Sequence, residues 1–367
     1  MSWFKSNVLE TNKKAGIYGA EWDGSSSTVW LRTDDAALFA EPIPQMSNGS
    51  GGWTQGSSPF DEIMPWAGMV VSEDSNAGTV VAIPKFYFKL GYANETSPYG
   101  LKIQISSTPF EGAMVSPAHQ DRGDGVGERD IVYVGRYHCA SDYKSKTGVT
   151  PYNNQTRGTF RNGIHNLGSN IWQWDYAILF TIQMLYLVEY ANWDSEGCIG
   201  YGCGNGSSVE NMGSTDSMTY HTGTNQTSRT TYGHTQYRNI EDLWGNVFDW
   251  CDGIYFSSSN VYAIKNPSSF SDTTGGTLVG TRPTSSACTT AYGVSSTDNF
   301  TWFMYPSAVG GSEATYIPDY CNYSSSGVVL FVGGKYGQYL SHGLFYLSGS
   351  YAAVLKYSDI GSRVMKT

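Results

Sequence analysis

Side chains suited to noncovalent recognition are concentrated near the end of this 367-residue chain. Between residues 333 and 359, tyrosine and serine are interleaved with glycine, lysine, histidine and aspartate. Such a mixture gives a loop surface adhesive area at low entropic cost. We therefore expect a ligand-binding surface formed by Lys335, Tyr336, Gln338, Tyr339, Ser341, His342, Ser348, Ser350, Tyr351, Val354, Leu355, Lys356, Tyr357, Ser358 and Asp359. The alternative interpretation is a run of ordinary edge strands and turns, in which the tyrosines cover sheet edges.

Residues that could support catalysis or bind a metal ion are scattered instead. The six cysteines are too sparse for a disulfide-stabilised fold, so we expect buried free thiols. Cys198 and Cys203 could form a disulfide or share a metal ion, but no histidine or further cysteine stands beside them at ligand spacing. His119 and His138 are isolated and are expected to be packed or solvent-facing. No segment has the oxygen-ligand spacing of an EF-hand, and we predict no metal, no cofactor and no catalytic residue.

Charge and hydropathy exclude two classes of partner. Lysine and arginine number 22 against 32 aspartates and glutamates, for a formal net charge of −10, and no basic patch suggests a nucleic-acid partner. The most apolar stretch, Ala177–Val188, is interrupted by Thr181 and Gln183 and is shorter than the ~20 residues that span a bilayer. The first residues lack the apolar core of a secretory signal. We expect a soluble protein without membrane insertion.

Strands and turns must position the C-terminal side chains. Glycine supplies 43 positions and only 15% of residues are charged, which is typical of a loop-rich, β-dominated protein. We predict strand-like pieces at Val329–Val332, Gly343–Leu347 and Ile360–Met365, alternating with the polar segments. One amphipathic pattern predicts a helix over Trp174–Asn192, and its Glu189 should need a partner if buried.

The region between helix and C-terminal segment contains a long loop and an aromatic core segment. Residues 200–235 form a Gly/Ser/Thr/Asn loop, and a loop of this length in a compact domain is usually functional or packs through its own side chains. Gly245 and Asn246 should form a turn with positive φ. Asn246 and Arg363 are expected to hold loops through hydrogen bonds. The aromatic residues expected in the core are Trp244, Phe248 and Trp250.

Residues 1–60 are interpreted as an N-terminal attachment or lead-in region. A strand–turn–strand pattern over residues 17–32 is followed by a polar, linker-like stretch over residues 42–59. The pattern becomes more regular from Phe60 onward. We therefore expect the main domain to comprise residues 61–367.

Four short motifs, in order, resemble the formylglycine-generating-enzyme family. They are Leu185-Tyr-Leu-Val-Glu-Tyr-Ala-Asn, Leu243-Trp-Gly-Asn-Val-Phe-Asp-Trp-Cys-Asp, Gly333-Gly-Lys-Tyr and Gly361-Ser-Arg. The family's corresponding motifs are Glu-Tyr-Ala-Ala, Gly-Asn-Val-Trp-Glu-Trp, Gly-Gly-Ser-Trp and Gly-Phe-Arg. The resemblance implies an α+β fold, an elaborated C-type lectin domain that is β-rich with long irregular loops and few helices.

Members of this fold family have two different kinds of function, oxidation and ligand binding. The cysteines and histidines that oxidation requires distinguish the two. The oxidases need a reactive cysteine pair between the last two motifs, whereas the last cysteine here is Cys321. The sulfoxide-forming relatives need a histidine cluster for iron, and the six histidines here are scattered. The chain more closely resembles the variable proteins of diversity-generating retroelements, which include phage tropism determinants. In these proteins the variable positions lie in C-terminal loops, here segment 333–359, on a lectin scaffold.

The resemblance implies a codon rule for the variable positions. Adenine-directed mutagenesis of asparagine codons ending in a pyrimidine yields tyrosine, serine, histidine, aspartate, valine and leucine, but not lysine or glutamine. Lys335, Gln338 and Lys356 therefore come from other codons or are fixed.

The expected function is non-enzymatic binding of a receptor, most consistent with a phage tail adhesin. The expected partner is a cell-surface protein or glycan, and a homotrimer is a possible assembly because avidity multiplies a weak single contact. The expected location is the virion, or the outside of a cell reached without a Sec signal. The alternatives are an oxidase of the formylglycine-generating or sulfoxide-forming type and a virion carbohydrate-binding module with a fixed surface.

Overall fold

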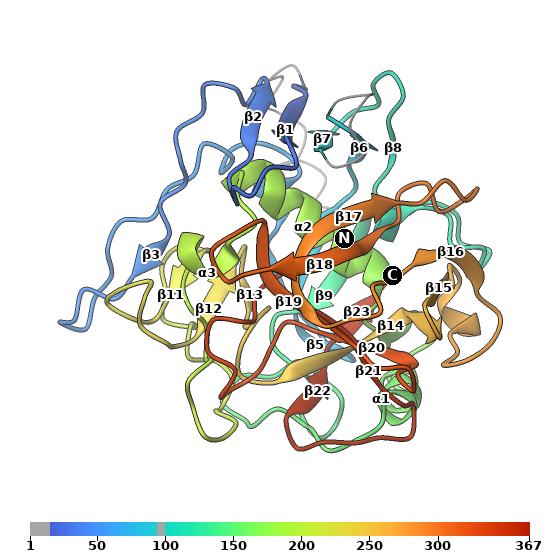
Figure 1. Cartoon of the computed structure of the whole chain (residues 1–367). Coiled ribbons are helices and arrows are strands. Elements are labelled where there is room, and N and C mark those ends of the chain that lie inside the picture. Colours follow the sequence, from blue (N-terminus) through green and yellow to red (C-terminus); the bar gives the residue numbers. More distant parts are fainter. Residues whose placement is uncertain (1–14, 94–99) are drawn as a thin grey trace.

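The computed structural model describes residues 15–93 and 100–367 and has the expected β-rich character with few helices (Figure 1). The α-helices of the described residues are α1 (Arg157–His165), α2 (Tyr176–Tyr190) and α3 (Ser195–Cys198). Single 3-10 turns occur at Trp66–Gly68, Pro117–His119 and Pro267–Ser269. None of the helices in the described part of the chain has the length and apolar character needed to cross a membrane.

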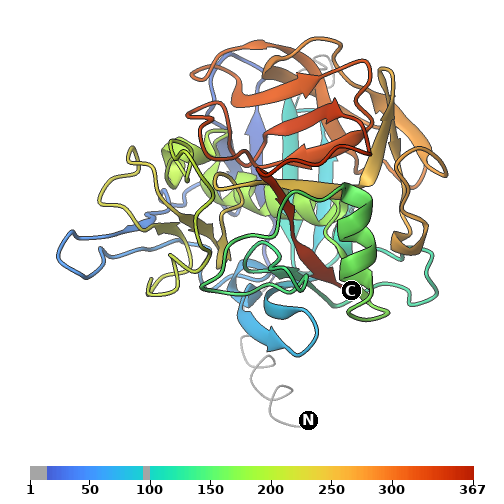
Figure 2. The ribbon, with the colours of Figure 1, turned by 90° about the horizontal axis from the view of Figure 1, so that it is seen from below.

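Helix α2 is the centre of the core, and Figure 2 shows it crossing the middle of the molecule. It begins where the Asp175 side chain accepts a hydrogen bond from the Ile178 amide at 3.0 Å. It ends at Ala191, whose left-handed φ of 48° stops the helix. The helix predicted over Trp174–Asn192 is therefore confirmed. Every residue of α2 is buried, so the helix packs on all sides and not through one broad face.

Glu189 is buried together with the rest of α2, and its carboxylate has the partner that we expected burial to require. Glu189 accepts hydrogen bonds from Arg238 Nε at 3.0 Å, Tyr237 Oη at 3.0 Å and Ser58 Oγ at 2.7 Å. These donors satisfy both carboxylate oxygens, which is the condition for a charge to be tolerated inside a core.

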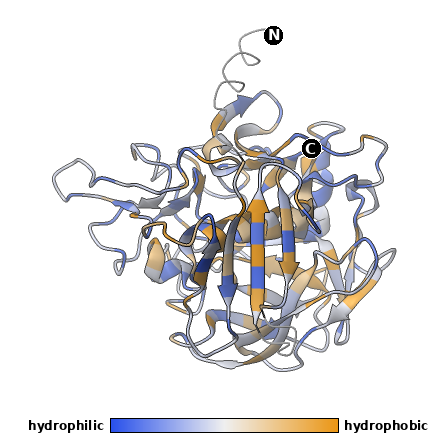
Figure 3. Ribbon diagram, turned by 90° about the horizontal axis from the view of Figure 1, so that it is seen from above, coloured by the Kyte–Doolittle hydropathy of each residue, from blue (hydrophilic) through white to orange (hydrophobic). Residues whose placement is uncertain are grey.

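The strands of residues 15–93 and 100–367 form four sheets. The first has the order β2–β1–β7–β6–β8, with strands Leu31–Asp34, Tyr18–Trp22, Leu101–Ser106, Tyr87–Gly91 and Met114–Val115. The second has the order β10–β23–β9–β5–β4, with strands Ile171–Gln173, Val364–Lys366, Ile131–Gly135, Gly78–Pro84 and Val71–Asp74. The third has the order β13–β12–β11–β3, with strands Ile240–Glu241, Thr235–Tyr237, Gly223–Thr224 and Gln45–Met46. Alternation of hydrophobic and hydrophilic residues is visible as bands along a strand in Figure 3, as expected for strands with one buried face.

The fourth sheet has nine strands and contains most of the C-terminal third of the chain. Eight follow the order β16–β15–β14–β20–β21–β19–β17–β18, and β22 pairs with β14 off this path. The bounds are Thr277–Thr281, Asn260–Ala263, Phe248–Ser257, Val329–Val332, Leu347–Tyr351, Ile317–Tyr323, Ala287–Val294 and Met304–Gly311, with β22 at Ile360–Ser362.

Residues 15–60 pack against later parts of the chain. Strand β1 lies between β2 and β7 in one sheet, and the Trp30 ring meets the Trp193 ring at a centroid distance of 5.0 Å. These contacts join the described part of the expected lead-in region to the expected main domain, residues 61–367. The part of the lead-in region before residue 15 lies outside the described residues.

The C-terminal strands match the sequence prediction in two of three cases. Val329–Val332 is strand β20, and Ile360–Met365 contains β22 and β23 on either side of Arg363. The expected strand at Gly343–Leu347 is wrong except for its last residue, which begins β21. Side chains replace a neighbouring strand there, because the Leu344 amide donates to Ser195 Oγ at 3.0 Å and the Phe345 amide to Asp319 Oδ2 at 2.6 Å.

Arg363 joins the C-terminal strands to the aromatic core, as its predicted role requires. It is fully buried, with Nε donating to Asp249 Oδ2 at 2.8 Å and Nη2 to the Glu241 carbonyl at 2.6 Å. The turn beside it has the predicted positive φ, 86° at Gly245 and 62° at Asn246. The aromatic residues predicted for the core are buried, namely Trp244, Phe248 and Trp250.

The cysteines and two histidines also lie as expected. All six cysteines are free, and all except the partly exposed Cys198 are buried. His119 is buried, with Nδ1 2.6 Å from Ser116 Oγ and Nε2 2.8 Å from the Ile83 carbonyl oxygen. His138 is buried against Asp249.

Burial of His119 predicts a dependence of stability on acid. Burial lowers the pKa of His119 from 6.5 to about 4, so the folded protein binds this proton less readily than the unfolded chain. This difference in pKa contributes about 3 kcal/mol to the free energy of unfolding. The contribution is complete above pH 6.5 and is lost as the pH falls toward 4. Urea unfolding across this pH range should show a shallower acid slope for His119→Gln than for wild type. Identical slopes would contradict the prediction.

Candidate functional site

The fold brings the two polar C-terminal segments to one end of β14. Asp249 in β14 pairs with Val332 of β20 on one side and with Gly361 of β22 on the other. The start of the segment that follows β20 and the end of the segment that precedes β22 therefore lie beside each other. An ion pair joins them, with Lys335 Nζ 2.6 Å from Asp359 Oδ2.

Along this part of the chain, exposed residues alternate with buried ones. Of the fifteen residues predicted to contact a ligand, thirteen are exposed or partly exposed. Val354 is 80% exposed, Tyr339 60% and Tyr357 37%. Residues 343–347 and 360–364, which separate or follow these positions, are all buried. We call the thirteen accessible residues the C-terminal surface; they are Lys335, Tyr336, Gln338, Tyr339, Ser341, Ser350, Tyr351, Val354, Leu355, Lys356, Tyr357, Ser358 and Asp359.

Two predicted contact residues are buried and do not belong to this surface. His342 has no exposed area, and burial lowers its pKa to about 4, so the ring is neutral at physiological pH. Ser348 is also fully buried, with its hydroxyl 2.9 Å from that of Ser350. Close packing beneath the loop explains the error at His342, because a Cβ on Gly334 would lie 2.1 Å from the His342 Cβ.

Aromatic residues from outside the C-terminal segment extend the surface. The Tyr339 ring meets the Tyr232 ring edge-on at 6.2 Å, and Tyr232 meets Tyr201 at 5.3 Å. Both added tyrosines are partly exposed and come from the long loop at residues 200–235. The length of that loop was the only signal of their role in the sequence. On the other segment, the Tyr351 and Tyr357 rings lie 4.6 Å apart.

The long loop and the turn at Asn246 support the C-terminal surface through backbone hydrogen bonds. The Tyr339 amide donates to the Gly204 carbonyl at 3.0 Å, and the Tyr336 amide donates to the Asn246 carbonyl at 3.0 Å. The Asn246 side chain accepts from the Glu210 amide at 2.9 Å and donates to the Glu210 carbonyl at 3.2 Å. The predicted role of Asn246 in holding loops is confirmed.

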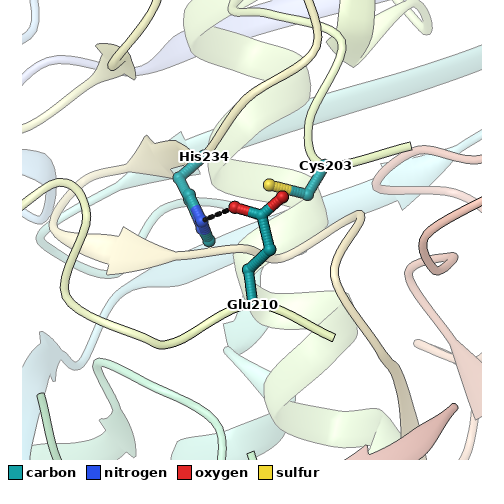
Figure 4. Close-up of side chains that lie close together, drawn as sticks. All are labelled: Cys203, Glu210 and His234. Carbon is teal, nitrogen blue, oxygen red and sulfur yellow. Dashed lines mark hydrogen bonds and ion pairs between the residues drawn. The ribbon is translucent and has the colours of Figure 1, made fainter. Parts of the chain in front are cut away.

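Three side chains of the types that bind metal ions lie where the long loop supports the C-terminal surface. The donor atoms of Cys203, Glu210 and His234 are all within 4.8 Å of one another, and Figure 4 shows the three side chains converging. His234 Nε2 is 3.2 Å from Glu210 Oε2, and His234 Nδ1 is 2.7 Å from Asp242 Oδ2. Although burial opposes it, the Asp242 carboxylate raises the pKa of His234 far above its usual range. Sequence spacing concealed this group because Cys203 and His234 lie at opposite ends of the long loop.

A second group, formed by His234, Glu241 and Asp242, differs because its carboxylates already have protein donors. Glu241 Oε1 accepts from the Gly213 amide at 2.6 Å, and Glu241 Oε2 accepts from the Thr215 amide at 2.8 Å. Asp242 accepts from His234. These hydrogen bonds explain the second group as a structural network.

The Lys335–Asp359 ion pair is expected to join the two segments without determining global stability. Its side chains are 30% and 18% exposed, and solvent-accessible ion pairs contribute about 0–1 kcal/mol. Asp359→Asn should change the free energy of unfolding in urea by less than about 1 kcal/mol. It should increase amide hydrogen exchange in residues 335–341. Asp298→Asn, at an exposed aspartate elsewhere, is the matched control, and a loss above about 2 kcal/mol would contradict this interpretation.

Comparison with known protein families finds no family model that matches this chain, and comparison with curated proteins likewise finds no match. The candidate site is therefore defined by the described residues themselves. They form a β-rich protein in which a tyrosine-rich surface is built from two C-terminal segments and the loop at residues 200–235.

Proposed function

We propose that this chain is a non-enzymatic ligand-binding protein that presents the C-terminal surface to a receptor. We further propose that it is a variable protein of a diversity-generating retroelement with an elaborated C-type lectin fold. The alternation of exposure carries the proposal, because thirteen predicted contact residues are accessible while residues 343–347 and 360–364 are buried. Substitutions at accessible loop positions usually change stability by less than about 0.5 kcal/mol, whereas substitutions in a packed core are costly.

The chemistry of the C-terminal surface supports recognition. Tyr339 and Tyr357 supply large, amphipathic side chains with few rotatable bonds, and the exposed Ser358 supplies a small polar group next to Tyr357 in the chain. Burial raises the pKa of the last cysteine, Cys321, to about 12, which makes its thiol a poor nucleophile and disfavours cysteine-based oxidation there.

The proposed partner is a cell-surface protein or a glycan, and the proposed location is a phage tail or another extracellular position. A formal net charge of −10 and the absence of a basic cluster in the surface residues are consistent with such a partner. A homotrimer would raise the avidity of a weak single contact.

A display library tests whether the surface tolerates and exploits variation. The library would randomise five surface residues together, namely Tyr336, Tyr339, Tyr351, Tyr357 and Ser358. Clones would be selected for binding to unrelated folded proteins that serve as targets. Recovery of specific binders that retain the wild-type unfolding midpoint would support the proposal. The matched control randomises buried residues 343–347, which should yield few folded clones. Equal recovery of folded binders from both libraries would contradict the proposal.

Sequencing of the DNA that flanks the gene tests the retroelement assignment separately. A reverse-transcriptase gene and a near-copy of the region encoding residues 333–359, differing at adenines, are expected. Absence of both would remove this assignment. A carbohydrate-binding module with a fixed surface would then be favoured if close relatives vary evenly across the chain.

A further inference from the structure

We propose that Cys203, Glu210 and His234 form a binding site for a zinc ion. The three residues offer one sulfur, one oxygen and one nitrogen ligand, which are the ligand types that zinc takes in proteins. Zinc with ligands at about 2.0–2.3 Å in tetrahedral geometry holds them roughly 3.3–3.8 Å apart. The observed 3.2 Å between His234 Nε2 and Glu210 Oε2 is close to that requirement.

The surroundings of His234 match the second shell of a zinc site. Its Nδ1 donates to Asp242 Oδ2 at 2.7 Å, which directs Nε2 toward Cys203 and Glu210. Metal-binding histidines almost always donate their other ring N–H to such a carboxylate or carbonyl, which fixes the ring and makes it a stronger ligand. Asp242 is itself 1% exposed and is held by its contact with Asn246 Nδ2 at 3.3 Å.

Access and rigidity also favour an ion at this position. Cys203 and His234 are 5% and 2% exposed, whereas the Glu210 side chain is 56% exposed, so an ion can enter from the Glu210 side. Three protein ligands leave a fourth position for water or an external ligand.

The site would brace the C-terminal surface. The Cys203 carbonyl accepts from the Asn246 amide at 3.2 Å, and the adjacent Gly204 carbonyl accepts from the Tyr339 amide at 3.0 Å. An ion that fixes Cys203 would therefore restrict the backbone that supports Tyr339. The inference concerns metal binding alone and goes beyond the proposed function, because it holds for any role of that surface.

Cobalt(II) titration of the tagless, reduced, metal-stripped full-length protein tests the site. Wild type should bind a single ion with a thiolate-to-cobalt charge-transfer band and tetrahedral visible bands, and zinc should displace it. Cys203→Ser should lose the charge-transfer band, and Glu210→Gln, at an exposed position that does not endanger folding, should weaken zinc binding at least about 10-fold. Asp242→Asn should weaken it about 10- to 100-fold as a positioning residue.

Controls separate coordination from general effects on the fold. Cys198→Ser and Glu111→Gln remove a thiol and an exposed carboxylate elsewhere and should leave zinc affinity unchanged. Zinc removal should increase hydrogen exchange in residues 336–341 of wild type but not of Glu210→Gln. Absence of zinc binding in wild type, or an unchanged charge-transfer band in Cys203→Ser, would overturn the site. Retention of copper or iron would instead favour the oxidase alternative, and failure of the display library would leave the zinc result unaffected.

Discussion

Replacing Arg363 by alanine is expected to lower the free energy of unfolding by about 3–5 kcal/mol, because it breaks a buried charge pair and leaves its partners uncompensated. Arg363 is fully buried and donates to the Asp249 carboxylate and to the carbonyls of Arg136, Glu241 and Asp242. Urea denaturation followed by tryptophan fluorescence measures the loss, since Trp250 lies in the same strand as Asp249.

Two comparison variants make the Arg363 prediction specific. Arg363→Lys keeps the charge but cannot reproduce the planar fork that reaches several carbonyls, so an intermediate loss is expected. Arg229→Ala removes an exposed arginine with one carbonyl contact and should change stability by less than about 0.5 kcal/mol. A loss below about 1 kcal/mol in Arg363→Ala would show that water or neighbouring groups replace its hydrogen bonds.

Glu189→Ala is expected to cost about 3–5 kcal/mol for a related reason. The substitution leaves the Arg238 guanidinium, only 2% exposed, without its buried carboxylate. The remaining acidic partner of Arg238 is the partly exposed Asp61, with Nη1 and Oδ1 3.1 Å apart. Because Glu189 lies in the last turn of α2, the loss should also loosen the end of this helix, which hydrogen exchange of residues 185–191 would detect.

A double substitution distinguishes loss of the pair from loss of packing. Glu189→Met combined with Arg238→Met replaces the buried ion pair with apolar side chains of similar length, a change that is often neutral or stabilising. The double variant should therefore be more stable than Glu189→Ala. Exposed Glu111→Ala is the single-site control. If the double variant is the less stable of the two, Arg238 contributes through hydrogen bonds beyond its pair with Glu189.

Local sequence signals predicted the elements whose geometry is determined locally. The apolar run after Asp175 formed α2, and β20 occupies the predicted residues because an unbroken apolar tetrapeptide suits a strand buried on both faces. Gly245 and Asn246 adopted positive φ because few other residue types do so at low cost.

Features that depend on distant neighbours were not predictable in the same way. Gly343–Leu347 has the composition of a strand, yet Ser195 and Asp319 accept its amide hydrogen bonds. His342 is polar, which favoured a surface position, but it is buried. Its burial was not predictable, because nothing in its local sequence reveals the loop packed above it. The convergence of Cys203 with His234 likewise requires both ends of a long loop to meet, which spacing along the chain does not encode.

The position of strand β23 has a consequence for the synthesis of variant chains. It lies between β10 and β9, and Arg363 immediately before it is part of the core. A premature stop codon anywhere in residues 333–359 would remove both, so the truncated chain would lack an interior strand of this sheet and would be a substrate for proteolysis. Only messages translated through the whole of residues 333–359 would yield a folded product. Nonsense changes would thus be eliminated at the level of the individual polypeptide.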